Sequence, residues 1–293
     1  MTIDPVVALE SLGYTEREAS FLYLVAIYSG YFLRRQFNYF IDRQKGYLSH
    51  RFVEKARVAG HIEIIDYGQK RFVYHLFAKP LYRLLGNSES QNRRRKGDSQ
   101  VRARLMALDY VLENSDEHYL ETEKAKLDFF TKTRGVNPDF LSDGYGRMHP
   151  FVSGFPVSVV DQSRPATSVV RFPFMDEGLL STKKFSRFLS EMLPLLFAIG
   201  NFEVIYAATS ATNFVAAEEV FWRTFARPVA EPQQVFADFR PTSAQPRVEN
   251  RSSLRSTFTT LLFQYSYPSL LRNEPRGSVQ GSEDGSEKQE EIA

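Results

Sequence analysis

The chain of 293 residues contains no cysteine. Disulfide bonds and thiolate zinc sites are therefore excluded, and because this suits a reducing compartment we expect a cytoplasmic protein. The sequence also has no apolar run near the roughly 18 residues that a membrane-spanning helix needs. Its first residues lack the basic and then apolar order of a secretory signal. We expect neither a membrane span nor a signal peptide.

Common cofactor and metal motifs are missing as well. No loop of the G-x-x-x-x-G-K-S/T type occurs, so the sequence gives no ATP or GTP site. The five histidines are scattered, and no two stand four residues apart, which argues against a zinc site on one helix. We expect no cofactor and no bound metal.

The net charge of +2 is the average of two opposite regions. Residues 34–71 hold nine Lys or Arg against four acids, whereas residues 274–293 hold six acids against two cations. Such asymmetry says more about partners than the total does. The early part of the chain is where an anionic partner is expected.

Residues 1–85 read as three helices and a hairpin. Thr15 and Glu18 have the spacing of a capping box, which predicts the start of a first helix. A short second helix is predicted over 32–41. In the third, Leu48, Phe52, Ala56 and Ala59 form an apolar stripe, which Gly60 ends.

Alternating residues at 61–64 and 72–76, with a turn at 67–70 between them, predict a β-hairpin. Three helices followed by a hairpin indicate a winged-helix domain over residues 1–85.

The remainder divides into three parts. Residues 86–99 have no apolar side chain and include four consecutive cations, which predicts a mobile basic linker. Helices are predicted where Val101, Leu105, Leu108 and Leu112 share a face and again near 121–132, so residues 86–136 form a linker and helical connector.

From 137 to 272 the pattern is β-β-α-β-α, which predicts an α/β domain, and residues 273–293 read as a disordered acidic tail. Strands are expected at 156–161, 168–174 and 202–209. Helices are expected at 184–199, at 213–226 and near 254–265. The fold class is α+β.

The winged helix offers a surface for duplex DNA. A helix of this kind fits the major groove, and the hairpin can follow the backbone. The residues expected to contact DNA are Arg34, Arg35, Tyr47, Ser49, His50, Arg51, Lys55, Lys70 and Arg71. The alternatives are a solvated basic face and a contact surface for another protein.

The stretch "GYLSHRFVEKARVAGHIE", the aromatic hairpin, the basic linker and "QVRARLMALDYVLEN" together resemble the replication-relaxation family of winged-helix proteins. The resemblance implies a role in transcription regulation, or in replication or transfer of plasmids and integrative elements. It also implies a C-terminal domain that resembles a restriction endonuclease. We expect this domain to be degenerate and to bind a second copy of the chain, giving a homodimer, or a protein partner.

A nuclease of that fold needs an acid at the end of one strand and an acid-x-Lys on the next, to hold a divalent metal and position water. Asp161 and Asp176-Glu177 end the two predicted strands, but position 178 is Gly and the nearest cations are Lys183 and Lys184. We therefore expect no enzymatic activity and two strand-end turns. A metal-dependent nuclease remains the alternative.

Overall fold

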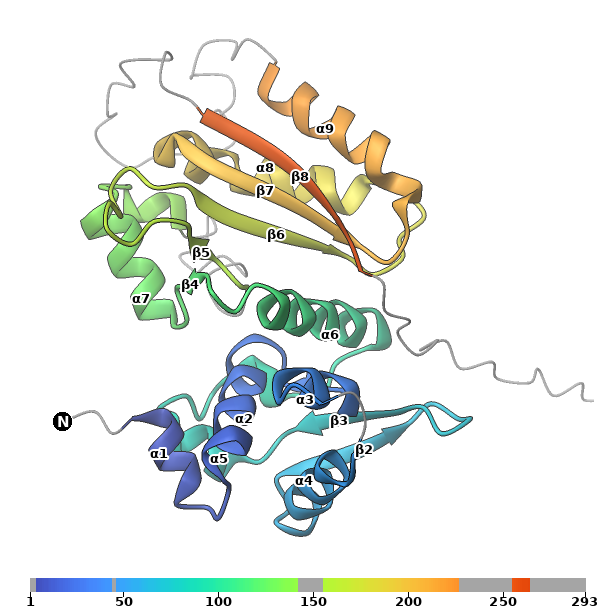
Figure 1. The fold of residues 1–293 in the computed structure, drawn as a ribbon. Coiled ribbons are helices and arrows are strands. Elements are labelled where there is room, and N and C mark those ends of the chain that lie inside the picture. Colours follow the sequence, from blue (N-terminus) through green and yellow to red (C-terminus); the bar gives the residue numbers. More distant parts are fainter. Residues whose placement is uncertain (1–3, 44–45, 142–154, 227–254, 264–293) are drawn as a thin grey trace, which may run out of the picture.

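The computed structural model describes residues 4–43, 46–141, 155–226 and 255–263. Helices surround two separate β-sheets, so the α+β class is confirmed. In Figure 1 an N-terminal unit lies below and a five-stranded sheet lies above, with one helix, α6, between them. None of the helices in these ranges combines the length and apolarity needed to cross a membrane.

The N-terminal unit wraps helices around a three-stranded sheet. Its elements are α1 (Pro5–Glu10), α2 (Glu16–Tyr28), β1 (Tyr31–Phe32), α3 (Arg34–Phe40), α4 (Tyr47–Val58), β2 (Ile62–Asp66), β3 (Phe72–Leu76) and α5 (Lys79–Leu84). The predicted capping box is present, since the backbone N–H of Thr15 donates to Glu18 Oε2 over 2.9 Å. The predicted hairpin is present too, and β3 pairs antiparallel with β2 on one side and β1 on the other.

An aromatic cluster fixes α4 against α2 and α3. The ring centroids of Phe37 and Phe52 are 4.2 Å apart, and Phe21 lies 5.1 Å from Phe37 and 5.8 Å from Phe52. All three rings are buried. Such pairs add to the gain from burying aromatic area, so the orientation of α4 is set by its inner face.

The segment before α6 is not the mobile linker that its composition predicts. It contains a short 3-10 turn, η1 (Gln91–Arg93), and the buried side chain of Asn92 donates to the carbonyls of Ala26 and Ile27 over 3.0 and 2.8 Å. These carbonyls lie in the last turn of α2, where helical partners are missing. Hydrogen bonds, rather than apolar burial, hold this polar segment in place.

Helix α6 (Asp98–Glu113) is buried on several sides at once. The four leucine and valine residues predicted to share a face are all buried: Leu108 and Leu112 join the core of α2 and α4, while Val101 and Leu105 pack on the other face of the three-stranded sheet. Met106, Ala107, Tyr110 and Val111 pack instead on the five-stranded sheet. The two units therefore share one helix as core.

The C-terminal unit is a mixed sheet in the order β4-β5-β6-β7-β8. Its elements are β4 (His118–Tyr119), α7 (Glu123–Asp128), η2 (Phe129–Thr133), η3 (Pro138–Leu141), β5 (Ser158–Val159), β6 (Val170–Asp176), α8 (Lys183–Ile199), β7 (Asn201–Ala208), η4 (Ala211–Asn213), α9 (Phe214–Ala226) and β8 (Arg255–Leu262). β6, β7 and β8 are parallel, and β5 is antiparallel to β6.

Alternate residues of β7 face opposite layers. Val204 and Tyr206 belong to the core beneath α8 and α9, whereas Ile205 and Ala207 belong to the core beneath α6. Figure 1 shows the same layering, with α8 and α9 on one side of the sheet and α6 on the other.

Two of the three predicted strands and two of the three predicted helices of this unit are present, as β6, β7, α8 and α9. The helix predicted near 254–265 is wrong, because residues 255–262 form β8 alongside β7. The β-branched Thr257, Thr259 and Thr260 favour a strand. The first predicted strand, 156–161, is reduced to the two residues of β5, and α8 continues through Pro194. The predicted tail, 273–293, lies outside the described residues.

Gly30 provides a test of how the segment before α6 is held. Its φ is 78°, and a Cβ added there would lie 2.1 Å from the carbonyl oxygen of Asn92. Gly60 has a similar φ of 67° but nothing within 4 Å of such a Cβ. Gly60→Ala should cost the left-handed penalty of about 1–2 kcal/mol. Gly30→Ala should lower the free energy of unfolding further, because Asn92 must move.

Urea unfolding of both variants measures the difference. Equal losses for the two variants would show that the Asn92 segment does not press on Gly30.

Candidate nucleic-acid interface

The first turn of α4 presents an open, cationic surface. Gly46 precedes the helix, no acid lies in its first turn, and Tyr47, His50 and Arg51 are exposed. The Arg51 guanidinium lies 5.9 Å from the centre of the Tyr47 ring, and the rings of Tyr47 and His50 are 6.4 Å apart. Arg51 forms no ion pair within the described part of the chain.

The buried stripe of α4 is rotated relative to the predicted one. The residues that point inward are Ser49, Phe52, Val53 and Ala56. Leu48 is 52 % exposed, and Ser49 is only 3 % exposed. The hydroxyl of Ser49 donates to the Gly46 carbonyl over 3.3 Å, so a small polar side chain can be buried here. The prediction that Ser49 lies on the exposed turn is wrong, and its burial argues against the predicted contact with DNA.

The cations in the second half of α4 are neutralised by acids. Lys55 Nζ lies 2.5 Å from Glu18 Oε2 and also donates to the Gly13 carbonyl, which ties α4 to the start of α2. Arg57 pairs with Glu54 at 2.6 Å, and this hydrogen bond lowers the pKa of the Glu54 carboxyl. Lys55, expected to contact DNA, is therefore held by Glu18.

The turn of the β2–β3 hairpin carries the next cations. Lys70 is exposed, and its φ of 61° is in the left-handed region. Arg71 bends back, with Nε donating to the Gly68 carbonyl over 3.2 Å. Asp66 accepts the N–H of Gly68 over 2.7 Å. Local hydrogen bonds thus shape the turn and leave the Lys70 ammonium facing solvent.

Arg34 and Arg35 have different roles although they are adjacent. Arg35 makes two parallel hydrogen bonds to the Asp109 carboxylate of α6, at 2.8 and 2.7 Å, and the Asp109 side chain is 4 % exposed. Arg34 is exposed and has no ion pair among the described residues. The Arg35 guanidinium fixes α3 to α6, which argues against the expected contact of Arg35 with DNA.

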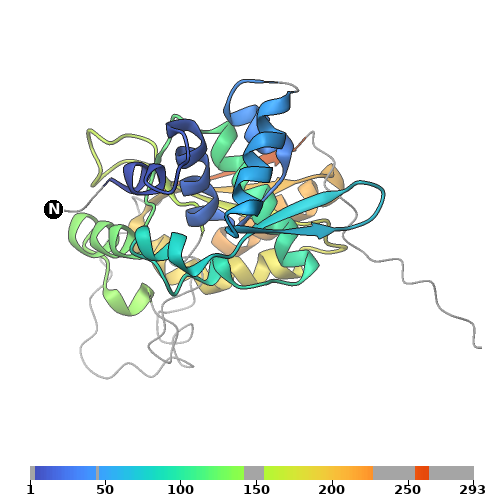
Figure 2. The ribbon, with the colours of Figure 1, turned by 90° about the horizontal axis from the view of Figure 1, so that it is seen from below.

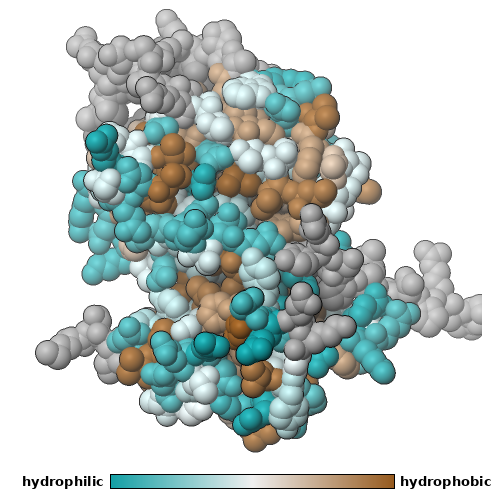
Figure 3. Space-filling view, viewed as in Figure 1, coloured by the Kyte–Doolittle hydropathy of each residue, from teal (hydrophilic) through white to brown (hydrophobic). Residues whose placement is uncertain are grey.

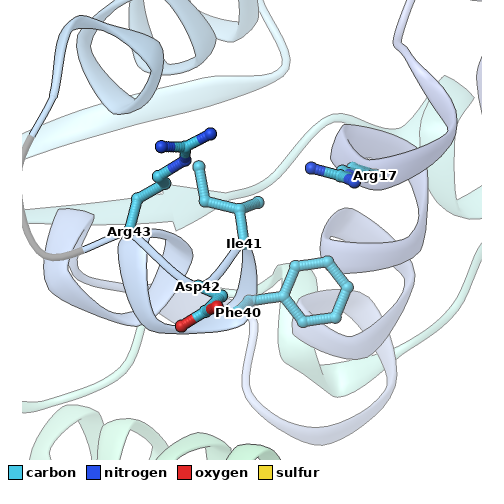
Figure 4. A pocket seen from close by; sticks show the side chains of 5 residues that line it. All are labelled: Arg17, Phe40, Ile41, Asp42 and Arg43. Atoms are coloured by element: carbon cyan, nitrogen blue, oxygen red, sulfur yellow. The ribbon is translucent and has the colours of Figure 1, made fainter.

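Sequence reasoning missed a pair of arginines near α4. Arg17, in the first turn of α2, and Arg43, after α3, line an open hollow of about 660 Å³ together with Phe40, Ile41 and Asp42. Figure 4 shows both guanidinium groups at this hollow. No sequence pattern connects two residues so far apart, and the fold alone brings them together.

The carboxylates considered for a nuclease site are far apart. Asp161 lies beyond β5 and Asp176 at the end of β6, and these strands are antiparallel. The loop after β5 returns to the start of β6, so the length of β6, roughly 20 Å at 3.3 Å per residue, separates the acids. Asp161 accepts from the backbone and hydroxyl of Ser163, which lower its pKa.

The acids after β6 stabilise the loop to α8. Asp176 is buried and accepts the Tyr206 hydroxyl at 2.6 Å, and Asn213 and the N–H groups of Gly178 and Leu179 also donate to it. Glu177 pairs with Lys184 at 2.5 Å. Among the described residues no group of three or more His, Asp or Glu could hold a metal ion.

No model of a known protein family matches the chain, and no curated protein and no solved structure gives a significant match.

Arg34 and Arg35 form a matched pair for mutation. Arg35→Ala leaves the Asp109 carboxylate buried without its main partner. We expect a loss of roughly 2–3 kcal/mol of folding free energy, below the ~3–5 kcal/mol of a fully buried pair because Arg35 is 30 % exposed. Arg34→Ala should leave stability within about 0.5 kcal/mol of the wild type. Chemical unfolding compares them.

A stable Arg35→Ala protein would mean that the α3–α6 ion pair contributes little.

Proposed function

We propose that the chain is a duplex DNA-binding protein in which residues 1–85 act as a winged helix. In this proposal α4 enters the major groove, the β2–β3 hairpin is the wing, and the protein acts in the cytoplasm. The order of helices followed by a hairpin, with β1 completing the sheet, supports this. In Figure 2 the hairpin extends away from the rest of the N-terminal unit, beside α4.

The observation that carries the proposal is the distribution of ion pairs along α4. Lys55 and Arg57 are neutralised by Glu18 and Glu54, whereas Arg51 forms no ion pair among the described residues, since Glu54 pairs with Arg57. A helix N-terminus also has free N–H groups and a partial positive charge, both of which favour phosphate. The end of α4 that would enter a groove is thus the end with free positive charge.

Other free cations extend this surface. Lys70 at the hairpin turn and Arg34 on α3 are exposed and unpaired in the described ranges. Arg17 and Arg43 add two guanidinium groups at the hollow between the start of α2 and the end of α3. Arginine and lysine contacts to phosphate position a protein on DNA, and base-edge contacts give specificity. We assign base contacts to Tyr47, His50 and Arg51, and backbone contacts to the others.

The biological role follows from the resemblance to the replication-relaxation family, which no family model supports. On that basis we propose a regulator of transcription or a factor in replication or transfer of a mobile element. The five-stranded sheet, a degenerate restriction-endonuclease-like domain in this proposal, would bind a second copy or a protein partner. A winged-helix surface that binds only protein is the competing function, and DNA titration distinguishes the two.

Binding of the full chain to duplex DNA should weaken steeply with salt. Each neutralised phosphate contributes about −0.9 to the slope of log K against log salt. Lys70→Ala should lower the magnitude of that slope by about one and weaken all sequences alike, because it removes a phosphate contact. Fluorescence anisotropy with a labelled duplex at several salt concentrations gives both values.

The control is Lys132→Ala, which removes an exposed cation that pairs with Asp128 on the C-terminal unit. If the wild type does not bind duplex DNA at low salt, or if its affinity does not change with salt concentration, the DNA proposal is contradicted and the protein-contact function is favoured.

A further inference from the structure

A second run of positive charge lies outside the surface described above. Arg93, the last residue of η1, is followed by Arg94, Arg95 and Lys96 before α6 begins. Arg94 and Arg95 are exposed, and neither forms an ion pair in the part of the chain that the structure describes. We call Arg94 and Arg95 the cationic strip.

The strip is held in place from both ends by buried groups. On one side Asn92 donates to the last turn of α2, and its carbonyl lies against Gly30. On the other side the buried Tyr31 hydroxyl accepts the N–H of Lys96 over 2.8 Å and donates to the Arg94 carbonyl over 3.4 Å. The backbone of the strip is fixed by these contacts, so its two exposed side chains start from fixed positions.

Several cations lie close together at this place, and no ion pair in the described ranges involves Arg94 or Arg95. Burial lowers the pKa of Lys96, and the nearby cations Arg104 and Arg94 lower it further. Asp98, the next acid along the chain, accepts a hydrogen bond from the Tyr67 hydroxyl over 3.0 Å. Holding like charges together opposes folding unless an anion offsets the repulsion. The arrangement therefore favours an anionic partner outside the chain.

The strip also adjoins the hairpin turn. Tyr31 and Tyr67 pack in the same cluster as Val73, on the face of the sheet opposite the core that holds α4. The charge of Arg95 acts on the hydroxyls of both tyrosines. Tyr67 immediately precedes the turn with Lys70 and Arg71. The cationic strip and the hairpin turn thus form neighbouring parts of one positive surface, which begins on the side of the hairpin away from α4.

We infer that Arg94 and Arg95 bind phosphates of the same duplex that α4 contacts, so that the DNA backbone is held on both sides of the hairpin. The inference rests on the proposed DNA binding and extends it. It assigns a phosphate-binding function to a segment whose composition is that of a plain linker. Arginine suits this role because its planar group donates two hydrogen bonds to one phosphate.

The test compares two double variants of the full chain that lose the same charge. Arg94→Ala/Arg95→Ala should lower the magnitude of the salt slope on random-sequence duplex by about 1.8, at 0.9 per phosphate. Lys124→Ala/Arg164→Ala removes two exposed cations of the C-terminal unit and should leave the slope unchanged. Arg94→Lys/Arg95→Lys should restore most of the slope. Circular dichroism confirms folding of each variant.

The outcomes separate the two proposals. If the wild-type salt slope is steep and Arg94→Ala/Arg95→Ala has the same slope, the inference that the cationic strip binds phosphates is overturned, whereas DNA binding by α4 is not. A slope that falls equally in both double variants would also overturn this inference, because net charge alone would then be the cause. A wild type that binds no duplex at low salt overturns the DNA proposal and the strip together.

Discussion

Burial of α6 on several sides is the constraint on which the rest of the structure depends. Leu108 faces the core of α2 and α4, Leu105 faces the back of the three-stranded sheet, and Met106 faces the five-stranded sheet. Every residue from Leu105 to Leu112 is buried, and a helix buried on all sides is stable only inside a larger body. The bidentate contact of Asp109 with Arg35 satisfies the one buried carboxylate of α6. The two units consequently form one body with a shared helix.

This constraint separates the cations of the N-terminal unit into two groups. Arg35 and Lys55 hold helices together through Asp109 and Glu18. Arg34, Arg51 and Lys70 form no ion pair among the described residues, and all three are exposed. An exposed cation adds little to stability even when it is paired, so leaving Arg34, Arg51 and Lys70 unpaired costs the fold little. Cations without acids are those that a polyanion can use.

Periodicity predicted much of the fold and less of the interface. The capping box follows from the spacing of two polar residues. The helices α4 and α8, the hairpin and β7 follow from the local spacing of their apolar residues, which indicates helix or strand without knowledge of the partners. Strand β8 forms by pairing with β7, and the sequence of residues 255–262 alone does not indicate that partner. The role of Arg35 depends on a carboxylate 74 residues away in the sequence. The burial of Ser49 depends on a one-position rotation of the buried stripe of α4. The fixed position of the cationic strip could not be predicted from composition either. It depends on hydrogen bonds from Asn92 and Tyr31, whereas composition indicates order only through apolar residues.

In the proposed function the first turn of α4 reads the DNA sequence, and the hairpin only positions the protein on the duplex. A side chain that contacts a base edge contributes about 1–3 kcal/mol of discrimination. The most direct measurement is a competition titration of Arg51→Ala between a selected duplex and a scrambled one, beside Lys70→Ala. We expect Arg51→Ala to reduce the preference for the selected duplex at least about fivefold. Lys70→Ala should reduce the affinity for both duplexes equally. Lost preference in Lys70→Ala with unchanged preference in Arg51→Ala would contradict this assignment of roles.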